Sequence, residues 1–222
     1  MSELTLYIVK GACSLVPHAL LEHLGIPYNI IDMVITPEGC AAADASMSAA
    51  QYRTIHPLGS VPALQLASGD VITENAAILA YINSLAPENT MFGRSPLEYA
   101  QVIQWFSLLS GGLHAQAFGA LLRPERFTDS EACLDAVRTK GKIRVGEYFA
   151  LMDRQLEGKK YAVGEALTAA DFYMTVFFYW ARRNRLDMDG KYANYKRIIK
   201  TVESTGAWRT TMAEEGITLA FA

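Results

Sequence analysis

The hydrophobic periodicity changes near residue 85, and this change divides the 222-residue chain into two parts. Before it, short apolar runs with strand character alternate with helical segments; beyond it, apolar residues recur only with the helical period. This pattern is typical of an α/β domain followed by an all-α domain. We predict an α/β domain over residues 1–85, a linker over 86–95 and an all-α domain over 96–222.

The first part has the order β-α-β, an irregular stretch, β-β and α. Strands are predicted at 4–9, 28–34, 61–66 and 71–73, with helices from Ser14 to Gly25 and onward from Asn75. Residues 38–50 are rich in Ala, Ser and Gly and lack a firm period, so they are compatible with either a loop or a weak helix.

The second part contains helical segments around 105–122, 143–156, 169–180 and 195–202. Thr168 and Asp171 have the spacing of a capping box at the start of the third segment. The apolar residues that follow them predict a helix buried in the domain core.

Composition excludes several classes of function. The net charge is -3, and no block of like charges is present that would attract nucleic acid. No apolar run approaches the ~20 residues that span a bilayer, and the N-terminus has no signal-peptide pattern. We therefore predict a cytoplasmic protein without nucleic-acid or membrane partners.

The three cysteines, Cys13, Cys40 and Cys133, are widely spaced and form neither a CxxC pair nor a cluster with metal-ligand spacing. Neither a disulfide framework nor a metal site is predicted. Cys13 lies where the first strand passes into the first helix, and a helix N-terminus lowers a cysteine pKa and favours the thiolate. Cys40 and Cys133 lie at no such junction and are interpreted as structural.

Four further positions have two interpretations each. The Ser14 hydroxyl either caps the first helix or donates to an anionic sulfur of a ligand. Pro62 is either an edge-strand proline or a cis proline that leaves the Val61 backbone free to pair with an extended peptide. Glu74 and Asn75 are either a capping pair or a site for the two charges of an amino acid.

His114 is a single histidine on a predicted helix, and most histidines in such a place are structural.

Taken together, these residues resemble the cytosolic glutathione S-transferases, most closely the bacterial beta class. The resemblance is carried by Gly11-Ala-Cys-Ser-Leu-Val-Pro-His18, by His56-Pro-Leu-Gly-Ser-Val-Pro-Ala-Leu64, and by Thr73-Glu74-Asn75 before Ala77-Ile78 and Tyr81-Ile82. The Thr168–Asp171 box and the segment from Trp105 to His114 match the helical half. The resemblance covers residues 4 to about 216.

The resemblance implies a thioredoxin-like α/β N-terminal domain, an all-α helical-bundle C-terminal domain and a homodimer. It implies that Cys13, Ser14 and His114 are catalytic, with a cis Pro62. The glutathione-binding residues would be Ala12, Cys13, Ser60, Val61, Pro62, Glu74, Asn75 and His114. An apolar wall of Phe118, Tyr179 and Trp180 would receive the second substrate.

This sequence departs from the beta class at three places. Thr36-Pro37 and Ala115 stand where lysines for the glycyl carboxylate of glutathione are expected, and Asn75 replaces a small residue.

The resemblance predicts an enzyme of detoxification that activates the thiol of glutathione for attack on small hydrophobic electrophiles. Glutathione is a co-substrate, and no cofactor is required. One alternative makes Cys13 the nucleophile in glutathione-dependent thiol-disulfide exchange, dehalogenation or ether cleavage. Another keeps the fold as a non-catalytic ligand-binding module.

Overall fold

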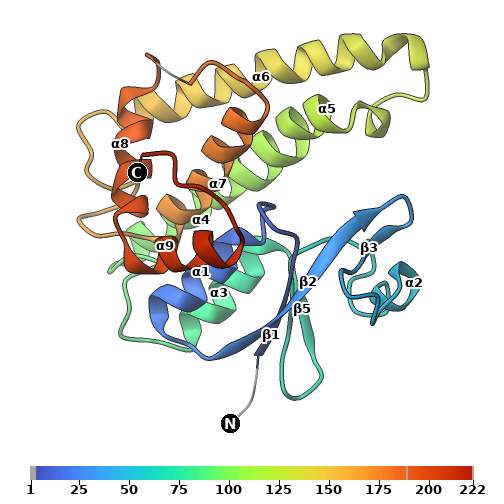
Figure 1. Cartoon of the computed structure of the whole chain (residues 1–222). Coiled ribbons are helices and arrows are strands. Elements are labelled where there is room, and N and C mark those ends of the chain that lie inside the picture. The colour runs from blue at the N-terminus through green and yellow to red at the C-terminus, as the bar shows by residue number, and fades with distance from the viewer. Residues whose placement is uncertain (1–3, 189, 222) are drawn as a thin grey trace. The chain divides into compact units, whose positions relative to one another are not determined.

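The structure is a computed structural model that describes residues 4–188 and 190–221. In it the chain divides into two compact units. The first unit runs to Phe92 and includes the C-terminal stretch from Val202, and the second unit spans Gly93–Thr201. The C-terminal stretch thus packs with the first unit, whereas the sequence assigns residues 96–222 to one helical domain. Figure 1 shows the elements along the chain.

A mixed sheet forms the centre of the first unit, and its five strands within the described residues have the order β3-β2-β1-β4-β5. β1 and β2 run parallel, and each other neighbouring pair runs antiparallel. A parallel pair needs a crossover connection, which α1 supplies. The predicted β-α-β and β-β order is confirmed. The strands are β1 (Leu4–Ile8), β2 (Tyr28–Thr36), β3 (Gly39–Ala42), β4 (Ala63–Gln65) and β5 (Val71–Thr73).

Two helices pack together against this sheet, namely α1 (Leu15–Leu24) and α3 (Asn75–Ser84). α1 ends at Gly25, whose left-handed backbone (φ 62°) closes the helix as the sequence predicts. A further helix, α9 (Gly206–Glu214), packs on α1 although almost the whole chain separates them. The sequence analysis did not predict α9.

Residues 38–50 hold more regular structure than the sequence predicts. β3 pairs antiparallel with β2, and the N–H of Cys40 also donates to the Gly59 carbonyl at 2.8 Å. A short helix, α2 (Ala49–Tyr52), begins with a capping box between Ser48 and Gln51. That Ser-x-x-Gln spacing was present in the sequence and is the signal that could have revealed α2.

The second unit is helical, as predicted. Its buried helix α7 begins at Ala169. The carboxylate of Asp171, in the first turn of α7, accepts from the N–H of Thr168 at 2.8 Å and of Ala162 at 2.7 Å. No described helix is long and apolar enough to cross a membrane. The helices are α4 (Pro96–Ser107), η1 (Leu108–Phe118), α5 (Gly119–Leu122), η2 (Pro124–Arg126), η3 (Glu131–Cys133), α6 (Leu134–Gln155), α7 (Ala169–Arg183) and α8 (Ala193–Glu203), of which α8 runs on into the first unit.

The segment η1 is a π-helix, a wider form that is rare and concentrated at functional sites. It contains Gly111 and Gly112, and a Cβ at Gly112 would collide with the hydroxyl of Tyr148 on α6. Gly141 of α6 likewise has no room for a Cβ beside the backbone of Leu121. These glycines let η1 and α5 approach α6 closely, and η1 carries His114.

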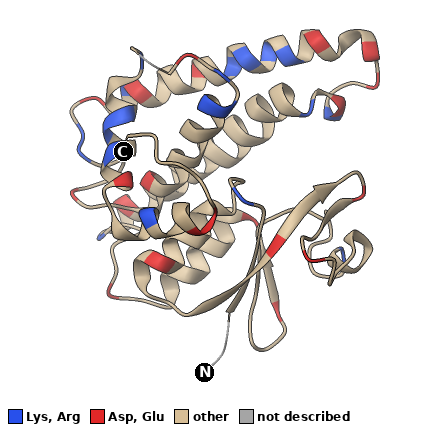
Figure 2. Ribbon diagram, in the orientation of Figure 1, with Lys and Arg blue, Asp and Glu red and all other residues tan. Residues whose placement is uncertain are grey.

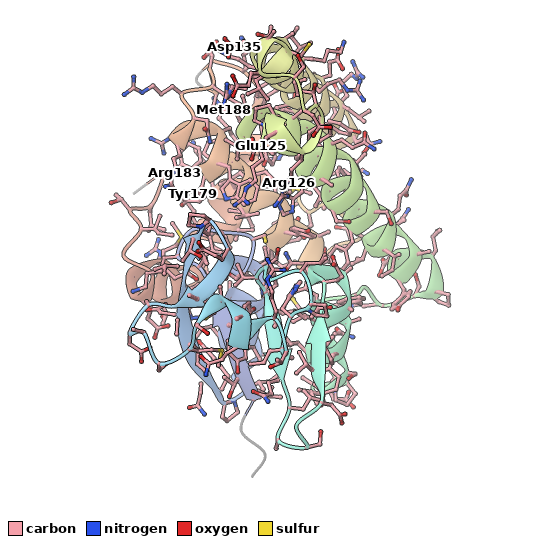
Figure 3. All side chains as sticks on the ribbon, turned by 90° about the vertical axis from the view of Figure 1, so that its right-hand side faces the viewer. Glu125, Arg126, Asp135, Tyr179, Arg183 and Met188 are labelled. Atoms are coloured by element: carbon pink, nitrogen blue, oxygen red, sulfur yellow. The ribbon has the colours of Figure 1, made fainter. Side chains whose placement is uncertain are left out.

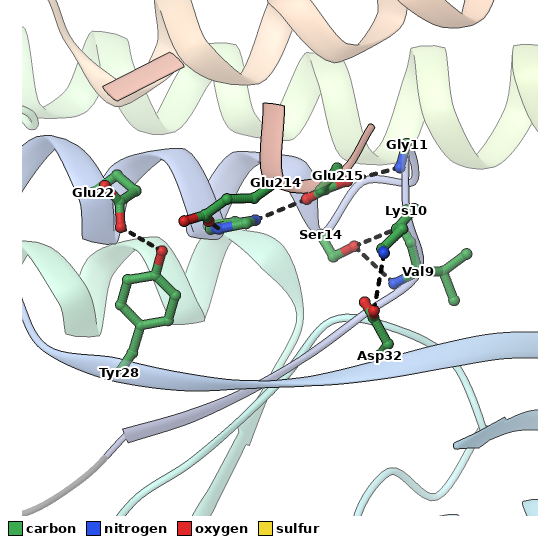
Figure 4. A network of polar contacts seen from close by, with 10 residues as sticks. Val9, Lys10, Gly11, Ser14, Glu22, Tyr28, Asp32, Glu214 and Glu215 are labelled. Atoms are coloured by element: carbon green, nitrogen blue, oxygen red, sulfur yellow. Dashed lines mark hydrogen bonds and ion pairs between the residues drawn. The ribbon is translucent and has the colours of Figure 1, made fainter. Parts of the chain in front are cut away.

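His18 of α1 joins that helix to the end of α9, where Figure 4 labels Glu214 and Glu215. Its buried ring lies between two carboxylates, with Nδ1 2.8 Å from Glu215 Oε1 and Nε2 2.9 Å from Glu214 Oε2. Burial alone would lower the pKa of His18, but the hydrogen bonds and charges of Glu215 and Glu214 outweigh burial and raise it. The two carboxylates therefore favour the protonated, cationic form of the ring.

Replacing His18 with glutamine should destabilise the protein by about 3 kcal/mol near pH 6, because buried Glu215 loses its charge partner. The pKa of His18 is raised in the folded state. Its contribution is thus complete below the unfolded pKa of about 6.5 and is lost as pH rises through the higher folded value. The difference in the free energy of unfolding between wild type and variant, measured by urea unfolding, should therefore be smaller near pH 9 than near pH 6.

The matched control is His23→Gln on the last turn of the same helix. Because burial lowers the pKa of His23, the difference in the free energy of unfolding between wild type and this variant should not become smaller as pH rises. The charge-pair account would be contradicted if the loss of unfolding free energy in His18→Gln stays constant or increases from pH 6 to pH 9.

Candidate active site

Three segments of the first unit that are far apart in sequence meet at Cys13. The Cys13 thiol donates to the Val61 carbonyl at 3.4 Å, and the Asn75 amide Nδ2 donates to the Cys13 carbonyl at 3.2 Å. Cys13 follows Gly11, which has φ +72°, and a turn in which the Ala12 N–H donates to the Val9 carbonyl. The start of α1, the entry to β4 and the start of α3 are thereby joined around one sulfur.

The Val61–Pro62 peptide bond is cis, as the resemblance implies. Val61 is half-buried and Pro62 is buried, and both precede β4 rather than belong to it. The preceding carbonyl, that of Ser60, accepts a hydrogen bond of 2.8 Å from the hydroxyl of buried Tyr52. This bond fixes the segment that faces Cys13.

Glu74 and Asn75 stand at the start of α3. Glu74 has φ 68° and ψ 125°, a backbone conformation that costs a non-glycine residue about 1–3 kcal/mol and is concentrated at ligand-binding positions. Its side chain is exposed and does not cap the helix. Asn75 is buried, and its Oδ1 has no hydrogen-bond partner among the described residues. The pair is therefore not the ordinary capping pair that the sequence also allowed.

The electrostatics of Cys13 differ from the sequence-based expectation. Burial raises the pKa of the Cys13 thiol to about 12, although hydrogen bonds from its own backbone and from Asn75 act in the opposite direction. The negative charge of Glu74 raises the pKa further. The predicted thiolate at the start of α1 is thus wrong, because desolvation exceeds the effect of the helix terminus. At neutral pH Cys13 carries an S–H that can donate.

Ser14 has a structural role that the sequence analysis did not consider. Its hydroxyl donates to the Val9 carbonyl at 3.1 Å and accepts from the Val9 N–H at 3.2 Å, and its side chain makes no capping bond to α1. Its single hydroxyl hydrogen is therefore used, and the residue is fully buried. The predicted cap is therefore wrong, because the hydroxyl instead joins the segment after β1 to the start of α1. The predicted role of Ser14 as a donor to a ligand sulfur stays a prediction.

Glu215 supports the same loop and was missed by the sequence analysis. Its Oε2 accepts from the Gly11 N–H at 2.8 Å, while its Oε1 faces His18. Because these residues are about 200 positions apart, no local pattern could have revealed the contact. Glu215 therefore positions the loop that carries Cys13.

His114 lies on η1 in the second unit. The His114 ring meets Trp180 edge-on at 4.9 Å and Phe177 at 5.8 Å between ring centroids. Burial, together with the positive charges of Arg126 and Arg123, lowers the pKa of His114 to about 4. The imidazole is therefore neutral at physiological pH, with one nitrogen as a donor and the other as an acceptor.

The predicted apolar wall is only partly accessible. Phe118 is 1% exposed and packs among Phe149, Phe177 and Trp180, so it belongs to the core of the second unit. Trp180 and Tyr179 are half-buried and offer surface, and Figure 3 shows Tyr179 on α7. Phe118 thus packs against Trp180 within the core and is too buried to line a pocket itself.

A cavity of about 660 Å³ opens in the first unit between α1, β2 and α9, and Cys13 is not among the residues that line it. Its carboxylates already have partners (Figure 4): Lys10 for Asp32, Tyr28 for Glu22, and His18 for Glu214 and Glu215. We therefore place the candidate site at Cys13. The described residues contain no cluster of side chains that could hold a metal ion.

Comparison with known families agrees with this geometry. The family model of the glutathione S-transferase N-terminal domain matches residues 12–85, and that of the C-terminal domain matches residues 114–205. The chain belongs to the glutathione S-transferase family. The resemblance inferred from the sequence is thereby confirmed, together with the fold and with the prediction that the chain is an enzyme of this family.

Individual relatives support the family assignment. Glutathione S-transferase GST-4.5 of Xanthomonas campestris pv. campestris is 26% identical over 83% of this chain and 86% of its own length. The beta-class enzyme of Sphingomonas chungbukensis superposes with a TM-score of 0.83 at 27% identity, over 96% of this chain and 100% of its own. A sphingomonad glutathione S-transferase complexed with glutathione superposes with a TM-score of 0.82 at 26% identity, with the same two shares.

The raised pKa of Cys13 predicts low reactivity toward alkylating agents. Iodoacetamide at about pH 7.5 should modify exposed Cys133 and leave Cys13 unmodified, because the thiolate and not the thiol is the nucleophile. Peptide mapping by mass spectrometry would measure both sites, with protein unfolded in urea as the control in which all cysteines react. Alkylation of Cys13 in the folded protein at a rate like that of Cys133 would contradict the assigned protonation state.

Proposed function

We propose that the chain catalyses the attack of glutathione on small hydrophobic electrophiles. The observation that carries this proposal is the meeting of the Cys13 thiol, the cis Val61–Pro62 segment and the start of α3 within the first unit. The sphingomonad relative that superposes on this chain was solved with glutathione bound. A homodimer, a role in detoxification and a cytoplasmic location are parts of the same proposal.

Glutathione would bind as an extended peptide along Val61. The Val61 backbone lies outside β4, so its peptide groups can pair with the cysteinyl residue as an added strand. At the γ-glutamyl end, the exposed Glu74 carboxylate would meet the ammonium group. The N–H groups at the start of α3 would meet the carboxylate, since a helix N-terminus favours anions.

Cys13 would act as a hydrogen-bond donor. In this arrangement its S–H would turn from the Val61 carbonyl to the sulfur of glutathione and stabilise the thiolate. Lowering a thiol pKa by one unit corresponds to about 1.4 kcal/mol, which is within the range of a single hydrogen bond to a charged group. The thiolate then forms a C–S bond to the electrophile as the leaving group departs. His114, whose imidazole is neutral at this pH, remains a proposed catalytic residue.

The alternative in which Cys13 is itself the nucleophile is less well supported. That chemistry requires a Cys13 thiolate near neutral pH, and burial moves the pKa in the other direction. We therefore assign the nucleophile to glutathione and the supporting donor to Cys13.

The kinetics of Cys13→Ala separate these two roles. If Cys13 is a donor, the variant should keep activity toward 1-chloro-2,4-dinitrobenzene while kcat/KM falls about tenfold to a hundredfold, the usual effect of one bond to a charged group. The rising limb of the pH profile should shift to higher pH, because the glutathione thiolate loses a stabilising partner. Initial rates over a range of pH values would measure both effects.

Cys133→Ala is the matched control, since it removes an exposed cysteine from the second unit. Its rates should equal those of the wild type. The alternative in which Cys13 is the nucleophile would be supported by complete loss of activity in Cys13→Ala, together with a glutathione adduct on Cys13 of the wild type that dithiothreitol removes. Absence of both glutathione binding and conjugation in the wild type would contradict the proposed function.

A further inference from the structure

The chain folds back on itself after the helix that carries His114. The Arg123 N–H donates to the Gly119 carbonyl at 2.8 Å, and the Arg126 N–H donates to the Arg123 carbonyl at 3.1 Å. The Phe127 ring then lies against Gly119, where a Cβ would be 3.3 Å from Phe127 Cζ and 3.6 Å from the His114 carbonyl oxygen. The turn therefore returns Arg126 and Phe127 to the helical segment of His114.

Neither arginine of this turn has a counter-charge in the part of the chain that the structure describes. Among residues 4–188 and 190–221, neither Arg123 nor Arg126 forms an ion pair, and the exposed Glu125 between them forms none either. By contrast, Arg138 and Arg144 on the neighbouring helix α6 pair with Asp135 at 3.1 Å and Glu147 at 2.6 Å. Figure 2 shows both basic and acidic residues along this helix. Figure 3 shows Arg126 at the turn that follows α5.

Both arginines are close enough to His114 to act on its ring. Their positive charges contribute to the lowered pKa of His114, after the larger effect of burial. The imidazole is therefore uncharged at neutral pH, and the two guanidinium groups supply the positive charge of this region. A guanidinium is the cation best matched to a carboxylate, because its planar fork can donate two parallel hydrogen bonds.

An aromatic surface lies beside the same histidine. The half-buried Trp180 meets the His114 ring at 4.9 Å, and the Phe127 side chain is 48% exposed. Unpaired guanidinium groups on the same turn as the exposed Phe127 ring are suited to a flat ring that carries an anionic group. A neutral or cationic ligand would leave the arginines without a charge partner.

We propose that Arg123 and Arg126 bind a substrate carboxylate, and that the second substrate of the enzyme is an aromatic electrophile with such a group. This inference rests on the proposed function and deepens it. The glycyl carboxylate of glutathione has the same chemistry, and the sequence lacks the two lysines expected for it at Thr36 and Ala115. Separate measurement of the two substrates distinguishes these sources.

A matched pair of electrophiles isolates the carboxylate. In 4-chloro-3,5-dinitrobenzoate and its methyl ester, the glutathione thiolate attacks the ring carbon that bears chlorine. The C–S bond forms, the C–Cl bond breaks and chloride leaves. The carboxylate takes no part in bond making, so a difference between the two compounds reports binding of that group.

Arg126→Gln should raise KM for the benzoate about tenfold and change KM for the ester by less than about twofold, as expected for one lost charge-assisted bond. Arg123→Gln should act in the same direction, and the double variant should show the larger effect. The control is Arg138→Gln on α6, which removes the same charge from an exposed ion pair and should leave both electrophiles unaffected.

If KM for glutathione rises with both electrophiles while the benzoate and the ester behave alike, the carboxylate that these arginines bind is the glycyl group of glutathione, and the aromatic carboxylate is excluded. If neither KM changes in the double variant, the proposal is overturned.

A binding measurement keeps this test separate from the proposed function. Unreactive 3,5-dinitrobenzoate and its methyl ester can be titrated while tryptophan fluorescence is recorded, which gives Kd whether or not the chain conjugates anything. We expect the double variant to weaken binding of the benzoate about tenfold and to leave the ester unchanged. Equal affinity of wild type and double variant for the benzoate would overturn the proposal.

Discussion

The contact between the Cys13 thiol and the Val61 carbonyl is the interaction on which the candidate site depends. It brings the first turn of α1 against the cis Val61–Pro62 segment and buries the sulfur until its pKa reaches about 12. A sulfur that keeps its proton at neutral pH is a donor, which supports the proposal that the thiol of glutathione is the nucleophile. Burial thus makes Cys13 a hydrogen-bond donor rather than the reactive thiolate that its position at a helix start predicts.

Several polar contacts from distant parts of the chain hold that sulfur in place. The Ser14 hydroxyl bonds both backbone groups of Val9, and Glu215 accepts from the N–H of Gly11. The Asn75 amide donates to the Cys13 carbonyl. Each contact fixes the loop between β1 and α1. The C-terminal segment therefore contributes to the site although it contains no predicted site residue.

Local patterns predicted most elements of the fold, because periodicity and capping are properties of neighbouring residues. Gly25 ended α1, and Thr168 and Asp171 marked the start of α7, both as expected. β3 and α9 were missed, because β3 is a short run of small residues and the packing of α9 on α1 is stabilised by the distant charges around His18. The direction of the Cys13 pKa shift was also missed, since desolvation depends on the tertiary structure and not on the position at a helix start.

The ionisation of bound glutathione tests the central claim most directly. Thiolate absorbance in the ultraviolet can be titrated in the complex, and the Cys13 thiol does not interfere below about pH 10 because its own pKa is about 12. The account predicts that bound glutathione ionises at least one unit below the value of about 8.5 for a free cysteine thiol, and that this shift becomes smaller in Cys13→Ala. Glutathione that binds but ionises at its free-solution pKa would contradict the account.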